Sequence, residues 1–478
     1  MKQKVLWREL KGSIEPFHLY HLLHKQPCSF FLDSGQIGVA SRCRYSFIGF
    51  DPFLVVTSRG KEITVRSRDN LTRLTDNPLQ VLDIYYRRYA ALFSQGEVPE
   101  FLPFTGGMVG FFSYDLGRQI EEIPDTCIDD AGMEDCYLGF YDAAFIYDHR
   151  ERCWHAVATG LPCTGEEGEK QARTRLAEMK ELFTRACRTA PPVCHVTLHS
   201  PGRRRIEVES DFTEAEYLEA VERAREYIAA GDIFQVNLSH RLTAPLPAAP
   251  WEIYLTLRTI NPAPFSAYLN FAPWQVACAS MERFLLLDRG HVQTRPIKGT
   301  RPRGRTLEED ERMRQELAAS TKDKAELLMI VDLERNDLGR VCRIGSVRVP
   351  DLYAIEEYPT VFHLVSTIEG DLAEDKSPLD LLTAAFPGGS ITGAPKIRAM
   401  EIIDELEKHR RAIYCGSIGY LSFHGRMDLN IVIRTIYMKQ GRAYFHVGGG
   451  LTIDSDPRFE YEETWHKARA LIRALELA

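Results

Sequence analysis

The chain has 478 residues, a formal net charge of −8 and a composition of 44% hydrophobic and 26% charged residues. This length can bury a large core and predicts about three domains by size alone, and the composition is typical of a globular protein. The acidic balance argues against a nucleic-acid binder with a basic surface. Eleven cysteines, scattered without a CxxC pair or a His/Cys cluster, fit reduced thiols better than a disulfide framework.

Neither a membrane anchor nor a signal peptide is expected. No uninterrupted apolar run approaches the roughly 18 residues of a membrane span. The N-terminal stretch MKQKVLWRELKG lacks the apolar core of a signal peptide. We therefore expect a cytoplasmic protein that has neither a membrane nor a nucleic acid as partner.

The first part of the chain is predicted to form an antiparallel sheet. Short runs rich in β-branched and aromatic residues, such as SFFLDSG and YSFIGFDPFLVVTS, are separated by turn residues. One helix, from Pro78 to Phe93, interrupts them, and a polar helix follows the loop at GLPCTGEEG. A proline-rich stretch then indicates a linker. The predicted units are residues 1–189 for an N-terminal domain, 190–210 for the linker and 211–478 for a second domain.

The second part opens with a clear helix signal. Thr213 and Glu216 have the spacing of a capping box, and Gly231 is the expected C-terminal stop. The segment DIFQVNLSHRL predicts a strand, whereas Ser320 to Leu338 and Glu460 to Leu477 predict helices. Because strands and helices come in blocks rather than in strict alternation, the predicted fold class is α+β and not a doubly wound parallel sheet.

Two glycine-rich stretches resemble ligand loops without completing a known motif. Gly388 to Gly393 in FPGGSITGAPK has the spacing of a phosphate loop, but Ala394-Pro395 stands where Lys and Ser or Thr are needed. We interpret it as a tight loop that feeds a helix and whose backbone could line a small pocket. The HVGGGLT run permits close approach of a ligand to the backbone, although a sheet bulge is slightly favoured for this run alone.

Three glutamates form a candidate cation site. Glu326 lies within a predicted helix, and Glu460 and Glu463 are one helical turn apart on another, so that they share a face. Carboxylates from two helices suit magnesium, which is usually held by one or two carboxylates plus waters and the anion of a substrate. Each acid taken alone is more often a solvated surface charge.

The basic stretch RPIKGTRPRGR contains a candidate nucleophile. The preceding FLLLDRGHVQT predicts two short strands that turn at Arg289-Gly290, so Lys298 is expected where a strand runs out into a loop. Burial and cationic neighbours would both lower the pKa of the amine and make it nucleophilic. From this stretch alone, an anion anchor or a surface residue is the more common role.

Together these stretches resemble the chorismate-utilising family, which includes anthranilate synthase component I, aminodeoxychorismate synthase component I and the isochorismate and salicylate synthases. The similarity is dense from Asp211 to Ala474, through GDIFQVNLSHRL, MERFL, RPIKGTRPRG, AELLMIVDLERNDLGRV, FPGGSITGAPKIRAMEIIDELE and EYEETWHKARA. It is weaker in the N-terminal part, through FFLDSG and RYSFIG. The resemblance implies an anthranilate synthase component I-like fold, with two antiparallel β-sheets packed as a sandwich and surrounded by helices. It makes residues 211–478 the chorismate-binding catalytic domain.

Two positions separate the members of this family. Lys298 stands in PIKGT, where anthranilate synthases have Ala and aminodeoxychorismate synthases of this type have a Lys that is the covalent nucleophile. Gln235 stands where the water-using members have a Lys base, which favours ammonia over activated water. The resemblance thus implies an amino-group transfer of the transaminase class that converts chorismate and ammonia to 4-amino-4-deoxychorismate, for 4-aminobenzoate and folate biosynthesis. The alternative is the 2-amino product of an anthranilate synthase component I, in tryptophan biosynthesis.

The resemblance also implies a role for each site residue. Lys298 would attack C2 of chorismate, and Glu282 would protonate the departing C4 hydroxyl. The predicted magnesium residues are Glu326 and Glu463 as ligands, with Glu460 and Asp323 ordering the waters of the ion. The predicted substrate-binding residues are Tyr414 and Arg434 on the pyruvyl carboxylate, with Thr300, His363, Gly450, Lys467 and Gln235 around them. No segment resembles a glutaminase, so a separate glutamine amidotransferase subunit is expected to supply ammonia.

A tryptophan pocket in the N-terminal part is a further hypothesis from the resemblance. The matching residues are Asp33, Ser34, Arg44, Tyr45, Pro264, Phe265 and Ser266. Asp33 would take the amino group, Arg44 or a backbone N–H the carboxylate, and the proline and phenylalanine would form an apolar wall. In the alternative interpretation, these residues only pack the two halves of the chain together.

Two other classes of protein are weaker alternatives. A nucleic-acid binder could use the basic runs RPIKGTRPRGR and PGRRRIEV, but the acidic net charge and the lack of interleaved aromatic residues count against it. A catalytically inactive, tryptophan-binding regulator would not require the acids and Lys298, all of which are present.

Overall fold

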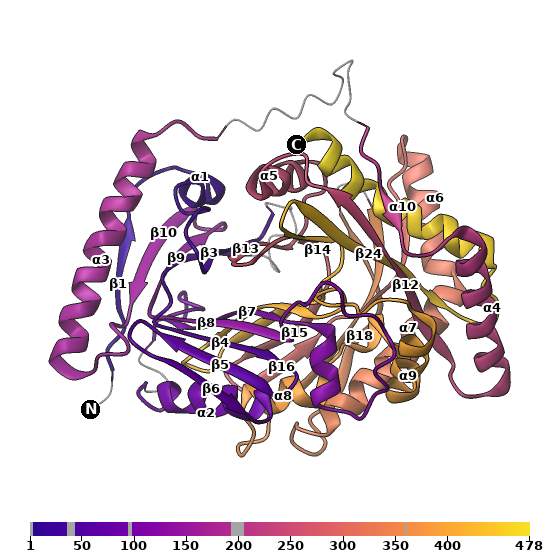
Figure 1. Ribbon diagram of the computed structural model, residues 1–478, viewed down its shortest axis with the longest axis horizontal. Helices are drawn as coiled ribbons and strands as arrows, with labels where there is room; N and C mark the ends of the chain where they lie inside the picture. Colours follow the sequence, from indigo (N-terminus) through magenta and orange to yellow (C-terminus); the bar gives the residue numbers. More distant parts are fainter. Residues whose placement is uncertain (1–2, 36–43, 94–97, 193–204, 359–360) are drawn as a thin grey trace.

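Two β-sheets lie face to face, with helices around them (Figure 1). The computed structural model describes residues 3–35, 44–93, 98–192, 205–358 and 361–478. Within these ranges each sheet contains 12 strands, and neighbouring strands are antiparallel, as between β12 and β24 and between β17 and β19. The predicted α+β class, a sandwich of two antiparallel sheets surrounded by helices, is confirmed.

The first sheet, sheet I, combines strands from the beginning, middle and end of the chain. Its hydrogen-bonded order is β1 (Leu6–Leu10), β10 (Cys153–Ala158), β9 (Ala143–Asp148), β3 (Tyr45–Gly49), β2 (Ser29–Asp33), β13 (Phe265–Phe271), β14 (Trp274–Ser280), β23 (Thr435–Lys439), β24 (Arg442–Leu451), β12 (Gln235–Pro245) and β11 (Glu209–Ser210). The short β20 (Gly393–Ala394) also pairs with β12.

The second sheet, sheet II, is equally mixed. Its order is β17 (Ile297–Pro302), β19 (Val361–Asp371), β16 (His291–Thr294), β15 (Arg283–Asp288), β22 (Met427–Asn430), β21 (Ser417–Ser422), β7 (Gly107–Phe112), β8 (Cys136–Tyr141), β4 (Leu54–Arg59), β5 (Glu62–Ser67) and β6 (Leu71–Thr75). The strand β18 (Arg348–Glu357) also pairs with β19.

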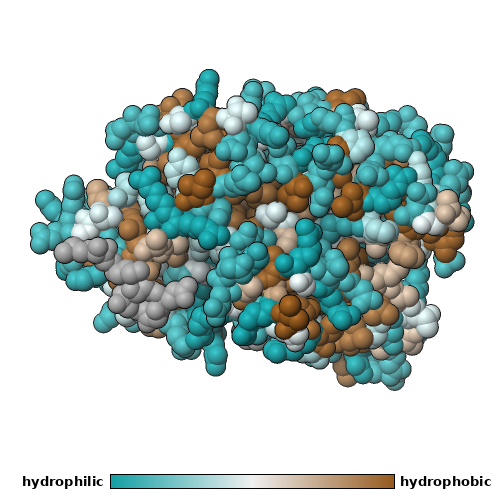
Figure 2. All heavy atoms as spheres, turned by 90° about the horizontal axis from the view of Figure 1, so that it is seen from below, coloured by the Kyte–Doolittle hydropathy of each residue, from teal (hydrophilic) through white to brown (hydrophobic). Residues whose placement is uncertain are grey.

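Helices cover the outer faces of both sheets (Figure 1). They are α1 (Pro16–His21), α2 (Pro78–Ala90), α3 (Gly165–Arg188), α4 (Glu214–Ala230), α5 (Pro250–Ile260), α6 (Leu307–Ala319), α7 (Thr321–Gly339), α8 (Pro378–Ala385), α9 (Lys396–Leu406) and α10 (Pro457–Leu477), with the 3-10 turns η1 (Tyr114–Gln119) and η2 (Gly389–Ile391). None of the helices in the described ranges is long and apolar enough to cross a bilayer. Figure 2 shows apolar residues interspersed among hydrophilic ones on the face seen from below.

The core has layers because side chains alternate along each strand. In β13, Ala267, Leu269 and Phe271 point into the cluster between the two sheets, whereas Tyr268 joins the cluster beneath α1, α3, α5 and α10. A third cluster fills the space between sheet II and α2, α7 and α8. Since both faces of the central strands are covered, these strands are apolar nearly throughout.

Segments on the two sides of the predicted linker pair directly. In sheet I, Ser266 of β13 is the partner of Asp33 of β2, and in sheet II, Ser417 of β21 is the partner of Phe112 of β7. Residues 193–204 of the linker lie outside the described ranges. The predicted units 1–189 and 211–478 therefore each contribute strands to both sheets.

Most of the local predictions are confirmed, but the one for Lys298 is wrong. Thr213 caps α4 in a capping box, and Gly231 ends the helix at a φ of 86°. The turn between β15 and β16 has positive φ at both Arg289 and Gly290, as a tight hairpin requires. Lys298 lies within β17 and not in a loop, because β17 pairs with the distant strand β19. The local sequence carries no sign of that partner.

Candidate active site

The amine of Lys298 lies between the two sheets, near β17 of sheet II and β24 of sheet I. Its Nζ donates a hydrogen bond to the carbonyl oxygen of Ser390 in η2 at 3.1 Å. A Cβ atom added to Gly450 would lie 3.2 Å from this Nζ. The glycine therefore leaves open the space beside the amine.

The HVGGGLT run is a continuous strand and not a bulge, which corrects the expectation for this run. β24 pairs with β12 without interruption from Arg442 to Leu451. The lack of a side chain at each glycine of this run leaves room for a different neighbouring group. An added Cβ would lie 2.4 Å from the Leu238 carbonyl oxygen at Gly448, and 3.3 Å from the Glu460 carboxylate at Gly449. The first glycine permits sheet packing, and the next two face the candidate site.

Glu282 is a buried acid in the short connection between β14 and β15. Its Oε1 accepts a long hydrogen bond of 3.5 Å from the backbone N–H of Ile297, next to Lys298. Burial raises the pKa of Glu282 to about 7, although a hydrogen bond with the Ser390 side chain and the charge of Lys298 oppose the increase. This carboxyl can therefore hold a proton near neutral pH.

The pKa of Lys298 shifts in the opposite direction. Burial lowers it below its ordinary value, while the carboxylates of Glu326 and Glu282 act against this effect. A lowered pKa increases the fraction of neutral amine, which is the nucleophilic form. The site thus combines a carboxyl whose pKa is raised and an amine whose pKa is lowered, and both shifts are in the direction needed for attack with protonation of a leaving group.

Thr300 and His363 lie side by side across the β17–β19 ladder. The Thr300 hydroxyl and Nδ1 of His363 are 2.9 Å apart, and the two residues are register partners. Burial lowers the pKa of His363 to about 4, and the positive charge of Arg434 acts in the same direction. His363 is therefore neutral at pH 7 and can form hydrogen bonds there without adding a charge to the site.

Arg434 provides a cation within the same site. Burial lowers the pKa of its guanidinium, while Tyr414 and Glu463 oppose the change. Nη1 of Arg434 donates to the carbonyl oxygen of Lys467 at 2.6 Å. The backbone of Arg434 has a φ of 53°, a conformation that side-chain-bearing residues rarely adopt and that often marks functional positions.

The acids on α7 and α10 lie close enough to influence one another electrostatically. Burial raises the pKa of Glu326, and the negative charge of Glu463 adds to the increase. Burial also raises the pKa of Glu460, which accepts a hydrogen bond of 2.8 Å from the Ser455 hydroxyl. Burial alone would raise the pKa of Glu463, but Lys467, at 2.5 Å, lowers it overall.

The carboxylates of α7 and α10 are of the type that binds magnesium, which requires only one or two protein carboxylates. Within the described ranges, no group of three or more His, Cys, Asp or Glu side chains is assembled as a metal cluster. Glu326 and Glu463 are each balanced by a positive side chain. Their partners are lysines, with Lys322 at 3.9 Å from Glu326 and Lys467 at 2.5 Å from Glu463. Asp323 lies nearby, paired with an arginine of β17 at 3.0 Å.

Oε1 of Gln235, at the start of β12, is buried and has no hydrogen-bond partner within the described chain. Buried polar groups are normally paired, so this oxygen is available to a bound molecule. Ser390 also belongs to the site, because its carbonyl oxygen accepts from Lys298 and its side chain hydrogen-bonds to Glu282. Ser390 was not among the predicted site residues. Its motif, PGGSITGAPK, was interpreted through its glycines and not through its serine, which was the available signal.

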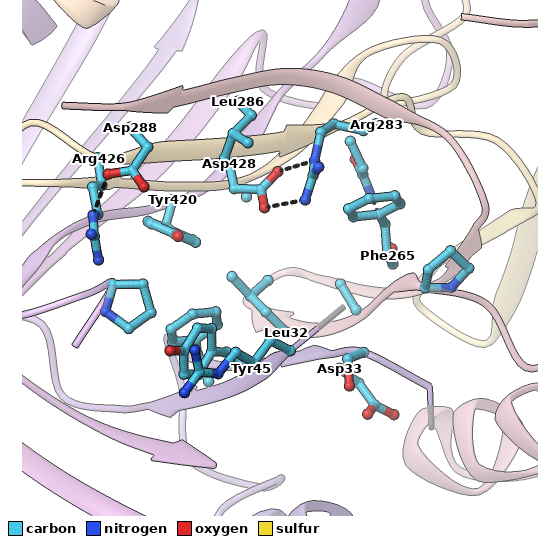
Figure 3. Close-up of a pocket in the computed structure, with 18 of the residues that line it drawn as sticks. Leu32, Asp33, Tyr45, Phe265, Arg283, Leu286, Asp288, Tyr420, Arg426 and Asp428 are labelled. Atoms are coloured by element: carbon cyan, nitrogen blue, oxygen red, sulfur yellow. Dashed lines mark hydrogen bonds and ion pairs between the residues drawn. The ribbon is translucent and has the colours of Figure 1, made fainter. Parts of the chain in front are cut away.

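A separate cavity of about 660 Å³ lies between β2, β3, β15 and β22 (Figure 3). All seven residues of the predicted tryptophan pocket line it: Asp33, Ser34, Arg44, Tyr45, Pro264, Phe265 and Ser266. Two ion pairs form part of its wall, Arg283 with Asp428 at 3.0 Å and Arg426 with Asp288 at 2.6 Å. The cavity thus offers both charges and apolar surface.

The charged residues predicted for this cavity are engaged elsewhere. The Asp33 carboxylate accepts hydrogen bonds from Arg258 at 2.5 Å and from the Tyr254 hydroxyl at 3.2 Å. Figure 3 shows it pointing away from the other labelled side chains. Arg44 is paired with Asp148 at 2.6 Å. Three further carboxylates line the cavity, and each of them is also paired with an arginine: Glu100 with Arg289, Asp288 with Arg426 and Asp428 with Arg283.

Comparison with known proteins gives one consistent match. The family model of the chorismate binding enzymes matches residues 29–473. The chain is 40% identical to anthranilate synthase component 1 of Acetivibrio thermocellus, over 97% of this chain and 93% of that protein. It is 41% identical to aminodeoxychorismate synthase component 1 of Escherichia coli K12, over 99% and 98%. Among solved structures, anthranilate synthase component I from Streptococcus pneumoniae superposes with a TM-score of 0.76 at 32% identity, over 90% of this chain and 92% of that one.

Proposed function

The chain belongs to the chorismate binding enzyme family, and from that premise we propose that it converts chorismate and ammonia to 4-amino-4-deoxychorismate. The observation that carries the proposal is Lys298, whose amine faces Gly450 and lies close to the buried acid Glu282. Both shifted pKa values suit the first step, because the amine must be neutral and the acid must be protonated.

In the proposed first step, Nζ of Lys298 forms a bond to C2 of chorismate. Both ring double bonds shift, from C1=C2 and C5=C6 to C1=C6 and C4=C5, the C4–O bond breaks, and Glu282 gives its proton to the oxygen, which leaves as water. In the second step ammonia forms a bond to C4, both double bonds return to their original positions and the bond from C2 to Lys298 breaks. The lysine leaves as a neutral amine, and Glu282 regains a proton from solvent.

The remaining residues bind and orient the substrate. Arg434 and Tyr414 would hold the pyruvyl carboxylate, since a guanidinium can bind both oxygens. Glu326 and Glu463 would hold magnesium, with Glu460 and Asp323 ordering its waters. When bound, the ion would neutralise the ring carboxylate and withdraw electron density from the ring.

The alternative is formation of the 2-amino product, anthranilate. Relatives that carry each of the two names have similar identity to this chain, so overall similarity does not separate the reactions. Lys298 favours the 4-amino product, because the 2-amino route requires no covalent attack at C2 by the protein.

Product analysis tests the proposal. The protein would be incubated with chorismate, an ammonium salt and magnesium, and the products would be separated by chromatography and mass spectrometry. We expect 4-amino-4-deoxychorismate and no rise in the fluorescence typical of anthranilate. A fluorescent 2-amino product would overturn the C4 assignment, and no consumption of chorismate under any of these conditions would overturn the activity itself.

We also propose that ammonia comes from a glutamine amidotransferase subunit. The relatives are named as component 1 of their enzymes, which implies a second component. Glutamine should then support turnover only when such a partner is added, whereas ammonium should support it without one. Turnover with glutamine by the chain alone would contradict this assignment.

For the cavity of Figure 3, we propose tryptophan as the ligand. Phe265 and Pro264 provide an apolar wall, and Asp428, which also accepts hydrogen bonds from Arg283, lies in the cavity lining as a second, shared acceptor for the amino group. Calorimetry with protein purified without tryptophan should detect binding that Phe265→Ala weakens. No binding at millimolar tryptophan would leave these residues with only a packing role.

A further inference from the structure

Arg411 is a fully buried cation just outside the residues assigned to the site. Its side chain is 1% exposed, and that of its partner Glu407 is 3% exposed. Nε of Arg411 donates to one oxygen of Glu407 at 2.9 Å and Nη2 to the other at 2.6 Å. A buried charge of this kind is costly unless it is fully paired, so each of its contacts is informative.

The other hydrogen bonds of Arg411 go to the backbone of two site elements. Nη1 donates to the carbonyl oxygen of Ile391 in η2 at 2.9 Å. Nη2 donates to the carbonyl oxygen of Asn237 in β12 at 2.5 Å. Ile391 directly follows Ser390, whose own carbonyl accepts from Lys298. Asn237 is two residues from Gln235, so both side chains lie on one face of β12.

Glu407, the ion-pair partner of Arg411, also binds β12. One of its oxygens accepts from both the backbone N–H and the hydroxyl of Ser239, each at 2.8 Å. The ion pair therefore holds β12 at Asn237 and at Ser239, and it holds η2 at Ile391. It fixes the separation between a strand of sheet I and the turn that contacts Lys298.

Arg411 also contacts the ring of Tyr414. Its guanidinium carbon lies 5.7 Å from the centre of that ring and 4.7 Å from the centre of the Tyr114 ring. The ring of His446 stacks on Tyr414 with centres 5.2 Å apart and an interplanar angle of 11°. The backbone N–H of Tyr414 donates to the carbonyl oxygen of Arg411 at 3.0 Å. The orientation of Tyr414 thus depends on Arg411 through both backbone and side chain.

We propose that Arg411 is a positioning residue that holds Tyr414, η2 and β12 in the arrangement that binds the pyruvyl side of the substrate. This inference rests on the proposed use of chorismate for its kinetic readout, but its structural content is independent of the product formed. A lysine could not replace the arginine, because the planar guanidinium sends its N–H groups to two carbonyls and two carboxylate oxygens in fixed directions, whereas an ammonium has three donors on a flexible chain.

The test compares Arg411→Lys with a matched control, Arg118→Lys. Arg118 is also largely buried, with a side-chain exposure of 14%. It pairs with three carboxylates, Asp115, Asp404 and, at 4.0 Å, Asp125, and donates to one backbone carbonyl. None of these contacts is to η2 or β12. Both variants keep the positive charge and lose the planar set of N–H donors of the guanidinium. An effect that any buried lysine would have on stability or activity should therefore appear in both.

Chorismate consumption and hydrogen exchange are measured for the parent and both variants. In Arg411→Lys the KM for chorismate should rise about tenfold, the factor that corresponds to one lost hydrogen bond at a positioned group. The magnesium concentration for half-maximal rate should stay unchanged, because Arg411 contacts neither α7 nor α10. The amides of residues 389–393 should exchange faster in this variant only. Arg118→Lys should leave all three quantities at parental values.

The outcomes separate a positioning role from general stabilisation. If Arg411→Lys lowers only kcat, with parental KM and parental exchange at residues 389–393, the arginine stabilises the fold and the proposal is wrong. Equal effects in both variants would also overturn it. Should Arg411→Lys not accumulate as folded protein, Glu407→Gln, which keeps the shape of the acceptor, must show the same changes to a smaller extent. If the parent does not consume chorismate, the proposed function fails, while the exchange comparison still decides the role of Arg411.

Discussion

Glu282→Gln should make the protein more stable at alkaline pH and nearly inactive. Burial raises the pKa of this carboxyl from 4.5 to about 7. Each pKa unit corresponds to about 1.4 kcal/mol, so ionisation of Glu282 in the folded state costs about 3 kcal/mol relative to the unfolded chain. Protonated Glu282 contributes to the free energy of unfolding below the pKa that this carboxyl has in the unfolded chain. The contribution is lost as the pH rises through the pKa that it has in the folded protein. Glutamine has the same shape and no charge, so it avoids this cost.

The expected difference in melting temperature follows from the size of the protein. An unfolding entropy of about 2.1 cal/mol/K per residue gives about 1 kcal/mol/K for the whole chain. The variant should therefore melt about 3 °C above the parent near pH 9, and the difference should largely disappear near pH 5. Loss of the general acid should lower kcat by about 10²- to 10⁴-fold. In the parent, the rate should fall as the pH rises above about 7, because Glu282 then loses its proton.

The assay is thermal unfolding of both proteins across this pH range, with chorismate turnover measured in parallel. Glu219→Gln, on the exposed side of α4, is the control for replacing a glutamate without burial, and it should show no pH-dependent difference from the parent. A constant melting difference between pH 5 and pH 9 for Glu282→Gln would refute the raised pKa. Retention of parental kcat would refute the role as acid.

Three further predictions concern the amine, the cation and the glycines. Lys298→Ala should lose most product formation at unchanged stability. An adduct of substrate mass on residue 298, trapped without ammonia, should occur in the parent only. A parental rate in the variant would exclude covalent catalysis. Glu326→Gln and Glu463→Gln should each raise the magnesium needed for half-maximal rate, since each removes a charged ligand, and two parental titrations would show that neither is a ligand. Gly450→Ala should fold normally but lose at least about tenfold in kcat, because its Cβ would displace the Lys298 amine. Gly448→Ala should instead lose stability, because its Cβ would lie 2.4 Å from a carbonyl oxygen of the neighbouring strand. Calorimetric melting with parallel rates checks this pair, and equal behaviour of the two variants would contradict it.

Local features of the fold were predictable because their causes are local. The capping box at Thr213 and the stop at Gly231 depend on residues within a few positions of each other. The hairpin turn at Arg289-Gly290 likewise depends on backbone conformations of adjacent residues. The acids one turn apart on α10 had to share a face for the same reason.

The chemistry of the site was also partly determined by sequence. The lysine in PIKGT, the glutamine at position 235 and the acids of α7 and α10 were identified by residue type and motif. What the sequence could not supply was proximity. Ser390 of η2 and Gly450 of β24 follow Lys298 in the chain by about 90 and about 150 residues. Lys298 contacts them only because the two sheets bring these distant segments together.

Only the tertiary structure decided which groups are free to bind a ligand. Asp33 has the right type and place for an amino group, yet Arg258 and Tyr254 already hold its carboxylate. Lys298 lies in a strand because β19, more than 60 residues away, provides its hydrogen-bond partners. A sequence specifies residue types and local backbone preferences. Which buried charge neutralises which, and how far burial moves a pKa, depends on long-range packing that no local pattern encodes.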